Sequence, residues 1–181
     1  MASVDILAPF ILSFEGGYVD HPCDRGGATN KGVTISTWRA CGYDKTGDGV
    51  VDSCDLKLLS DTEVIQRVLK PHYWDRCQGD EIEDQSVANI LVDWVWASGV
   101  WGIKHTQRIL GVESDGVIGE RSLRQINCRD AHDLFDKIKS RREQHFRSIV
   151  ERDPSQSIFL RGWLRRLGSI KYGALELNGD V

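Results

Sequence analysis

Residues 15 to 34 decide the fold, and they read Glu15-Gly-Gly-Tyr-Val-Asp-His-Pro-Cys-Asp-Arg-Gly-Gly-Ala-Thr-Asn-Lys-Gly-Val-Thr34. An apolar segment with helical spacing comes before Glu15, and Ser3 can cap its first turn. The glycine pair after Glu15 offers left-handed backbone positions that commonly end a helix. The second glycine pair, Gly26-Gly27, can fold the following residues back toward that helix end. The sequence therefore predicts a first helix that ends at an acidic side chain, followed by a small hairpin or turn region.

Glu15 has the position that a general acid needs. The negative end of the helix dipole and the apolar neighbours both disfavour its charged form, and a protonated carboxyl can donate to a leaving group. Glycosidases pair such an acid with a second carboxylate, for which Asp24 and Asp20 are the nearby candidates, while Thr29 can position a water. The ordinary alternatives are a solvated glutamate, an Asp24 that forms a turn with Arg25, and a Thr29 that belongs to a strand.

The same stretch resembles the signature of a known family. Glu-Gly-Gly-Tyr from Glu15 and Asp-x-Gly-Gly-x-Thr-Asn-x-Gly-Val-Thr from Asp24 are similar to the motif of the glycosyl hydrolase family 108 muramidases, which are also described as secretion-activating proteins. Members of that family are lysozyme-like, and they cleave peptidoglycan between N-acetylmuramic acid and N-acetylglucosamine. By this resemblance Glu15 is the proton donor. The spacing of Glu15, Asp24 and Thr29 also resembles the Glu-Asp-Thr trio of phage-type lysozymes.

Composition agrees with a compact enzyme that acts on a cell wall. The chain has 181 residues, with six tryptophans and four tyrosines for a core and for sugar-stacking faces. Residues 1–96 carry 8 basic and 16 acidic side chains, whereas residues 97–181 carry 15 and 11. The basic half can hold an anionic cell wall, or it can consist of ordinary solvated helix faces. No motif resembles a nucleic-acid-binding one, so we expect no nucleic-acid partner.

Sequence features that direct proteins to membranes are absent. No apolar run approaches the roughly 20 residues that span a bilayer, and no basic residue precedes the first apolar segment. We therefore expect a monomer made in the cytoplasm without a signal peptide, which reaches a bacterial cell wall after export or lysis.

The five cysteines form no close metal-ligand pair, and their odd number leaves at least one thiol unpaired in a monomer.

A second motif covers residues 44–55 and reads Asp44-Lys-Thr-Gly-Asp-Gly-Val-Val-Asp-Ser-Cys-Asp55. Its spacing is that of a calcium loop of EF-hand type. The ligands at positions 1, 3, 5, 7, 9 and 12 would be Asp44, Thr46, Asp48, the Val50 carbonyl, Asp52 and Asp55. Thr46 replaces the usual Asp or Asn, and Asp55 replaces the usual bidentate Glu. The motif predicts a structural calcium site, and the alternative is an Asp-Gly turn that needs no metal.

The remainder of the first half reads as helices. A capping box at residues 60–63 predicts a helix start, and residues 87–95 predict a buried central helix. Tyr18, Tyr73 and Trp74 are candidates to line the glycan groove, although core packing is the commoner fate of such rings. Asp93 lies in the buried helix and needs a partner there, which favours a structural role over a third catalytic carboxylate.

From about residue 97 the chain resembles the predicted peptidoglycan-binding module that is often fused to this family. The matching motifs cover residues 98–99, 107–112, 115–119, 122–123 and 159–166. Ala97 and Arg165 depart from it, because asparagine is usual at both places. The resemblance implies a muramidase lobe over residues 1–96, with the inserted loop at 44–55, and a helical lobe over 97–181.

Together these features predict a mainly α, lysozyme-like fold and a peptidoglycan hydrolase. Glu15 would protonate the leaving oxygen, with Asp24 or Asp20 and Thr29 assisting. Two rival functions remain. A lytic transglycosylase also uses one glutamate but needs no carboxylate to activate water, and a non-catalytic wall-binding module needs no acid at all.

Overall fold

The computed structural model describes residues 1–20 and 27–179 of the chain. The fold is mainly α and lysozyme-like, as predicted. The helices are α1 (Val4–Phe14), α2 (Ile35–Cys41), α3 (Ser53–Lys57), α4 (Asp61–Glu63), the π-helical η1 (Val64–Trp74), the short η2 (Asp75–Cys77) and η3 (Gly79–Glu81), α5 (Gln85–Ser98), α6 (Val100–Leu110), α7 (Glu120–Asn127), α8 (Ala131–Arg152), the short η4 (Pro154–Gln156) and α9 (Ser157–Gly168). Two small antiparallel pairs, β1 (Thr29–Asn30) with β2 (Val33–Thr34) and β3 (Ile170–Lys171) with β4 (Ala174–Leu175), complete the described fold.

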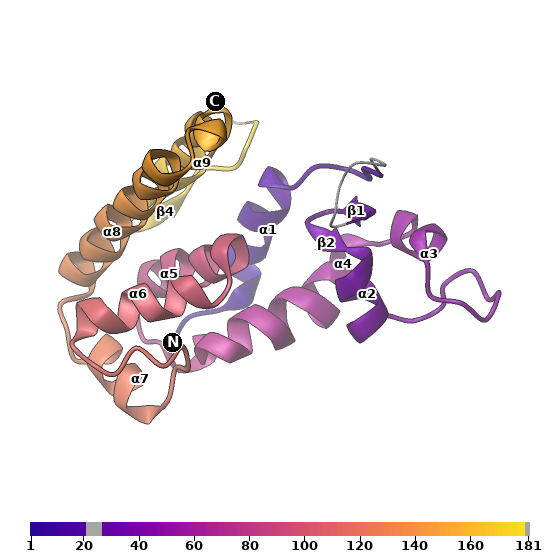
Figure 1. Cartoon of the computed structure of the whole chain (residues 1–181). Coiled ribbons are helices and arrows are strands. Elements are labelled where there is room, and N and C mark those ends of the chain that lie inside the picture. Colours follow the sequence, from indigo (N-terminus) through magenta and orange to yellow (C-terminus); the bar gives the residue numbers. More distant parts are fainter. Residues whose placement is uncertain (21–26, 180–181) are drawn as a thin grey trace.

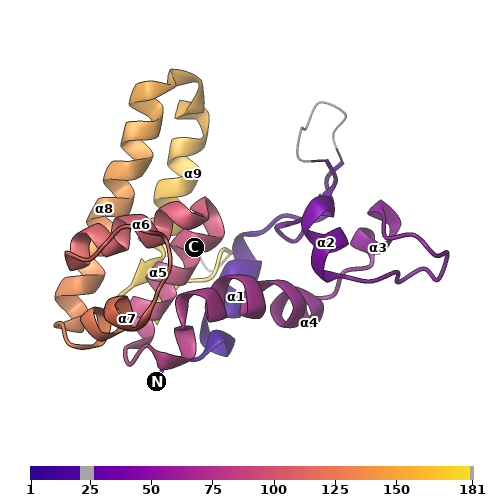
Figure 2. The same cartoon turned by 60° about the horizontal axis from the view of Figure 1, so that its bottom comes forward.

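The elements form two lobes that a long helix joins. Strands β1 and β2 lie with α2 and α3 in a small lobe, and helices α5 to α9 form a large lobe (Figure 1). The continuous helix α4–η1 runs from one lobe to the other, and α8 and α9 stand beside each other as a hairpin (Figures 1 and 2). Each lobe has its own buried apolar cluster, and the rings of Tyr73 and Trp96 pack against both clusters. These two rings therefore mark the junction of the lobes.

Helix α1 begins as the sequence predicts but ends differently. The Ser3 side chain accepts a hydrogen bond from the Asp5 N–H and caps the first turn. The helix ends at Phe14, and Glu15 caps it in an extended conformation with its N–H bonded to the Leu12 carbonyl. The glycines after Glu15 do not adopt positive φ angles, so the left-handed ending expected there is wrong. Glu15 therefore lies just outside the helix, with an extended backbone at φ −87° and ψ 137°.

The predicted hairpin follows in β1 and β2. Thr29 pairs with Thr34 and Asn30 with Val33, and a two-residue turn at Lys31 and Gly32 connects them. Both turn residues have positive φ, at 50° and 76°, as in the tight turns that suit the twist of a hairpin. The Asn30 amide donates to the Leu56 carbonyl at 2.7 Å and fixes the hairpin to α3.

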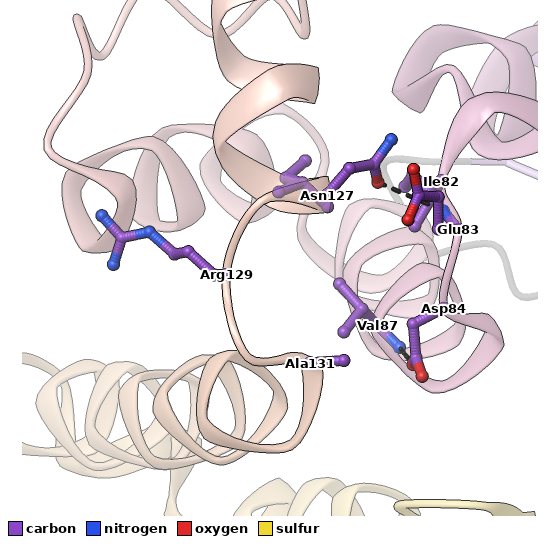
Figure 3. A pocket seen from close by; sticks show the side chains of 8 residues that line it. Ile82, Glu83, Asp84, Val87, Asn127, Arg129 and Ala131 are labelled. Atoms are coloured by element: carbon purple, nitrogen blue, oxygen red, sulfur yellow. Dashed lines mark hydrogen bonds between the residues drawn. The ribbon is translucent and has the colours of Figure 1, made fainter.

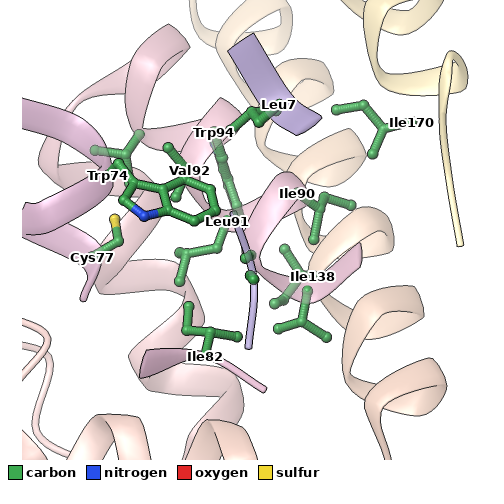
Figure 4. Close-up of a cluster of buried hydrophobic side chains, with 14 of the residues drawn as sticks. Leu7, Trp74, Cys77, Ile82, Ile90, Leu91, Val92, Trp94, Ile138 and Ile170 are labelled. Atoms are coloured by element: carbon green, nitrogen blue, oxygen red, sulfur yellow. The ribbon is translucent and has the colours of Figure 1, made fainter. Parts of the chain in front are cut away.

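Helix α5 is the centre of the large lobe. Its residues from Ser86 to Val95 are all buried, which explains its nearly continuous apolar sequence. Figure 4 shows Ile90, Leu91 and Val92 on this helix among Leu7 of α1, Trp74 of η1 and Ile138 of α8. The large core therefore takes side chains from both predicted domains, 1–96 and 97–181, and the boundary between them stays a prediction. Across the described residues, no helix has the length and apolar character to cross a membrane.

Candidate active site

The Glu15 carboxylate lies where the end of α1 meets α5 and α9. Its Oε1 accepts a hydrogen bond from the Trp96 indole N–H at 2.8 Å and another from Arg166 Nη1 at 2.8 Å. The Glu15 side chain is 17 % exposed, so the carboxyl is held by protein groups but still reaches solvent. Because Oε1 already accepts two N–H bonds, a proton on this carboxyl belongs on Oε2.

The hairpin turn closes on the other oxygen of Glu15. The Lys31 N–H donates to the Gly16 carbonyl at 3.1 Å, which holds the turn beside the acid. A Cβ at Gly32 would lie 2.7 Å from Glu15 Oε2 and 2.8 Å from the Trp96 ring. Gly32 also has a φ of +76°, which side chains rarely adopt. Only glycine fits at this contact between the small lobe and the acid.

Asp93 anchors the arginine that binds Glu15. Asp93 is fully buried, and it accepts a bond from Arg166 Nη2 at 2.7 Å. Arg142 Nη1 of α8, also fully buried, lies 2.8 Å from Asp93 Oδ2, although the angle there is outside that of a hydrogen bond. Burial alone would raise the pKa of Asp93, but the two guanidinium groups hold that pKa below its usual value. Asp93 is therefore a structural partner, as the sequence indicates, and it orients Arg166 toward Glu15.

The ion pair between Glu15 and Arg166 joins the two ends of the chain. Arg166 Nη1 lies 2.8 Å from Glu15 Oε1. The arginine lies 151 positions away in the chain, so local sequence could not predict this contact.

Two of the three aromatic rings predicted to line a groove lie near the acid or the hairpin. The Tyr73 and Trp96 rings are 4.6 Å apart between centroids, and burial raises the pKa of Tyr73, with a further rise from the Glu15 charge. The Tyr18 hydroxyl donates to Asp20 Oδ2 at 3.1 Å. The prediction for Trp74 is wrong, because its ring is fully buried in the core and its indole N–H is bonded to the Asp80 carboxylate. A ring without exposed surface cannot stack on a sugar.

The structure describes two of the three residues predicted to assist Glu15 in catalysis. Thr29 belongs to β1, where its backbone pairs with Val19 and its hydroxyl donates to the Gly27 carbonyl at 3.4 Å. It therefore lies on the hairpin whose turn contacts Glu15. Asp20 is exposed and bonded to Tyr18, and Asp24 lies outside the described residues. The identity of the second carboxylate stays a prediction.

The loop at residues 44–55 is held by its own hydrogen bonds. Asp44 accepts from the N–H groups of Gly47 and Gly49, and Asp55 accepts from those of Lys45, Thr46 and Asp52. Asp48 and Asp52 each accept one backbone N–H through Oδ1. Across the described residues, no three acidic, histidine or cysteine side chains converge as metal ligands. The six predicted ligands therefore lie in one loop, but their side chains do not converge on a common point in the described structure. Calcium binding stays a prediction.

A separate hollow lies at the opposite end of α5. Figure 3 shows Glu83, Asp84 and Val87 on one side and Asn127 and Ala131 on the other. Val87 and Trp96 are nine residues apart on the helix, which separates this hollow from the acid by about 14 Å. Asp84 there caps α5 and accepts a bond from Tyr172. Asp84 therefore has a structural role, and none of the residues that contact Glu15 lines this hollow.

Sequence reasoning missed three residues that build the site. Trp96 directly follows the segment 87–95 that predicts the buried helix, and Gly32 lies in the family motif without an assigned contact. Arg166 lies in the segment 159–166, which resembles a family signature, and that resemblance was the available signal. All three touch the Glu15 side chain or would clash with it if enlarged.

Comparisons with known proteins agree with the predicted family and fold. The sequence matches the family described as Glycosyl hydrolase 108 over residues 8–99 and the one described as Predicted Peptidoglycan domain over residues 101–168. Among solved structures, SagA from Brucella abortus is similar, with 31% identity, 95% of this chain and 93% of that chain covered, and a TM-score of 0.73. No curated protein sequence matches.

Proposed function

The chain belongs to the glycosyl hydrolase 108 family and is a peptidoglycan hydrolase, and from this membership we propose that it is a muramidase with Glu15 as its general acid. The bond that we propose is the β-1,4 bond between N-acetylmuramic acid and N-acetylglucosamine. The observation that carries the proposal is the fixed carboxyl of Glu15, which has one oxygen bound by Trp96 and Arg166 and the other beside Gly32.

The geometry supports a defined path for the proton. With Oε1 engaged by two donors, the acid donates from Oε2 to the leaving glycosidic oxygen. After it loses the proton, Glu15 is a carboxylate. The guanidinium of Arg166 then stabilises this negative charge. Asp24, or Asp20, would then stabilise the oxocarbenium-like centre or activate water, and Thr29 would help to hold that water.

The proposed substrate also indicates the partner of the enzyme and the place where it acts. Peptidoglycan is the partner, and the enzyme acts on the cell wall after export or lysis. We propose a monomer, in which Tyr18 and Tyr73 line the path of the glycan near the lobe junction. The loop at residues 44–55 would bind calcium in a structural role, with no part in the proton transfer.

Product analysis tests the reaction. Digestion of purified peptidoglycan, followed by mass spectrometry, should show muropeptides with reducing N-acetylmuramic acid ends. Anhydromuramyl ends would select the lytic transglycosylase, and reducing N-acetylglucosamine ends would show cleavage of the other glycosidic bond. Binding to peptidoglycan without any release would indicate a non-catalytic module. Any of these three results overturns the muramidase proposal.

A further inference from the structure

A cationic cavity lies beside the proposed active site in the large lobe. It has a volume of about 650 Å³ and is walled by the end of α5, by α6 and by α8. Its lining includes Ser98, Trp101, His105, Arg141, His145 and Arg152. Trp101 is 50% exposed and offers apolar surface to a ligand, and the Lys104 ammonium lies 5.8 Å from its ring centroid. Among the residues that the structure describes, no carboxylate belongs to the lining.

Two arginines give this cavity its charge. Among the described residues, neither Arg141 nor Arg152 pairs with a carboxylate, whereas Arg147 on the same helix pairs with Glu143 at 2.7 Å. Burial and the nearby arginines lower the pKa of His105 to about 4 and also lower that of His145. Both imidazoles are therefore neutral at pH 7, and the positive potential comes from guanidinium groups. Such a surface favours an anionic ligand.

The cavity shares wall residues with a second cavity that reaches a partner of Glu15. A smaller inner cavity of about 130 Å³ shares Ala97, Ser98 and Ile149 with it and reaches Arg166, the residue that binds Glu15. Trp96, the other partner of Glu15, directly precedes Ala97 in α5. Arg142 lines the inner cavity, and its side-chain nitrogens have no hydrogen-bond acceptor among the described residues. This buried guanidinium lies 2.8 Å from Asp93, which compensates its charge, so the unpaired positive charge of the cavity comes from Arg141 and Arg152.

We propose that the cavity binds carboxylates of the peptide stem that is attached to N-acetylmuramic acid in peptidoglycan. The inference rests on the proposed function, because it requires a glycan bound at Glu15. A stem of four residues spans at most about 14 Å when extended, and the cavity lining begins at Ala97, next to Trp96, which binds Glu15. Its carboxylates match Arg141 and Arg152, and its aliphatic groups match the face of Trp101. The cavity thereby makes the enzyme selective for peptide-bearing strands.

The test compares two substrates and two variants. One substrate is intact peptidoglycan, and the other is the same glycan after an amidase has removed its peptides. The variant Arg141→Ala/Arg152→Ala removes the unpaired charges, and Arg147→Ala is the matched control on α8. We expect the double variant to lose about tenfold more kcat/KM on peptide-bearing strands than on peptide-free strands. The reason is that loss of a hydrogen bond to a charged group weakens binding by about this factor. The control should leave the ratio of the two rates unchanged.

A direct binding measurement separates this inference from the proposed function. Calorimetry with a free stem tetrapeptide needs no turnover, and the double variant should bind it at least about tenfold more weakly than the wild type. Unchanged tetrapeptide binding and an unchanged substrate ratio in an active double variant would overturn the cavity assignment alone. A wild type that binds the tetrapeptide but releases no muropeptides would overturn the proposed function and leave the cavity assignment standing.

Discussion

Replacing Arg166 by alanine tests whether the buried charge network stabilises the junction of α1, α5 and α9 at Glu15. The change removes the only described cation that contacts both Asp93, which is fully buried, and Glu15, which is 17 % exposed. Removing one partner of a buried ion pair costs about 3–5 kcal/mol, because the remaining charge stays buried without full compensation. In a chain of this size each kcal/mol lowers Tm by about 2–4 °C, so the expected loss is about 6–20 °C.

The assay is urea and thermal unfolding, with Arg147→Ala as the control. Arg147 pairs with Glu143 on the surface of α8, and such exposed pairs contribute less than about 1 kcal/mol. Arg166→Lys keeps the charge but loses the planar fork that binds both carboxylates, so its stability should lie between wild type and Arg166→Ala. A double-mutant cycle with Glu15→Gln then gives the share that belongs to Glu15. The reasoning is refuted if Arg166→Ala destabilises the protein no more than Arg147→Ala does.

Three further predictions concern the hairpin, the loop and acid stability. Gly32→Ala should cost about 1–3 kcal/mol in urea unfolding and lower activity, because a Cβ would lie 2.7 Å from Glu15 Oε2 at a φ of +76°; an unaffected protein would contradict the close contact. Calcium at about 100 times its Kd should stabilise the fold by about 2.7 kcal/mol, and Asp44→Ala/Asp48→Ala should abolish the shift in Tm; a wild-type Tm that does not respond to calcium or chelator would leave the loop a plain turn. The pKa of His105 is about 4 in the fold, so the unfolded chain binds its proton first as the pH falls, and stability should decline between about pH 6.5 and 4. His105→Gln should have a shallower decline there, and identical slopes would count against a buried neutral imidazole.

Local sequence predicts those parts of the fold that local forces determine. The Ser3 cap, the capping box at residues 60–63 and the hairpin after α1 are all present, because each depends on residues a few positions apart. The burial of α5 follows from its apolar run. The helix ending at Glu15 was predicted at the right place but with the wrong backbone conformation, since glycine permits a left-handed turn without requiring one.

Long-range contacts account for what the sequence missed. Arg166 meets Glu15 and Asp93 only after α9 folds back along α8, which no local pattern encodes. Packing buries the ring of Trp74 and directs the indole N–H of Trp96 to Glu15, and local sequence indicates neither outcome. The resemblance at residues 159–166 pointed to the correct segment without indicating the contact.

The most direct test of the central claim is the activity of Glu15→Gln on purified peptidoglycan. The amide keeps the shape of the side chain but cannot donate an acidic proton to the leaving oxygen. A general acid contributes about 10²- to 10⁴-fold, so release of muropeptides should fall by at least about a hundredfold. The unfolding curve should remain cooperative, which separates lost chemistry from lost structure. A folded Glu15→Gln protein that releases muropeptides at the wild-type rate would contradict the assignment of Glu15 as the acid.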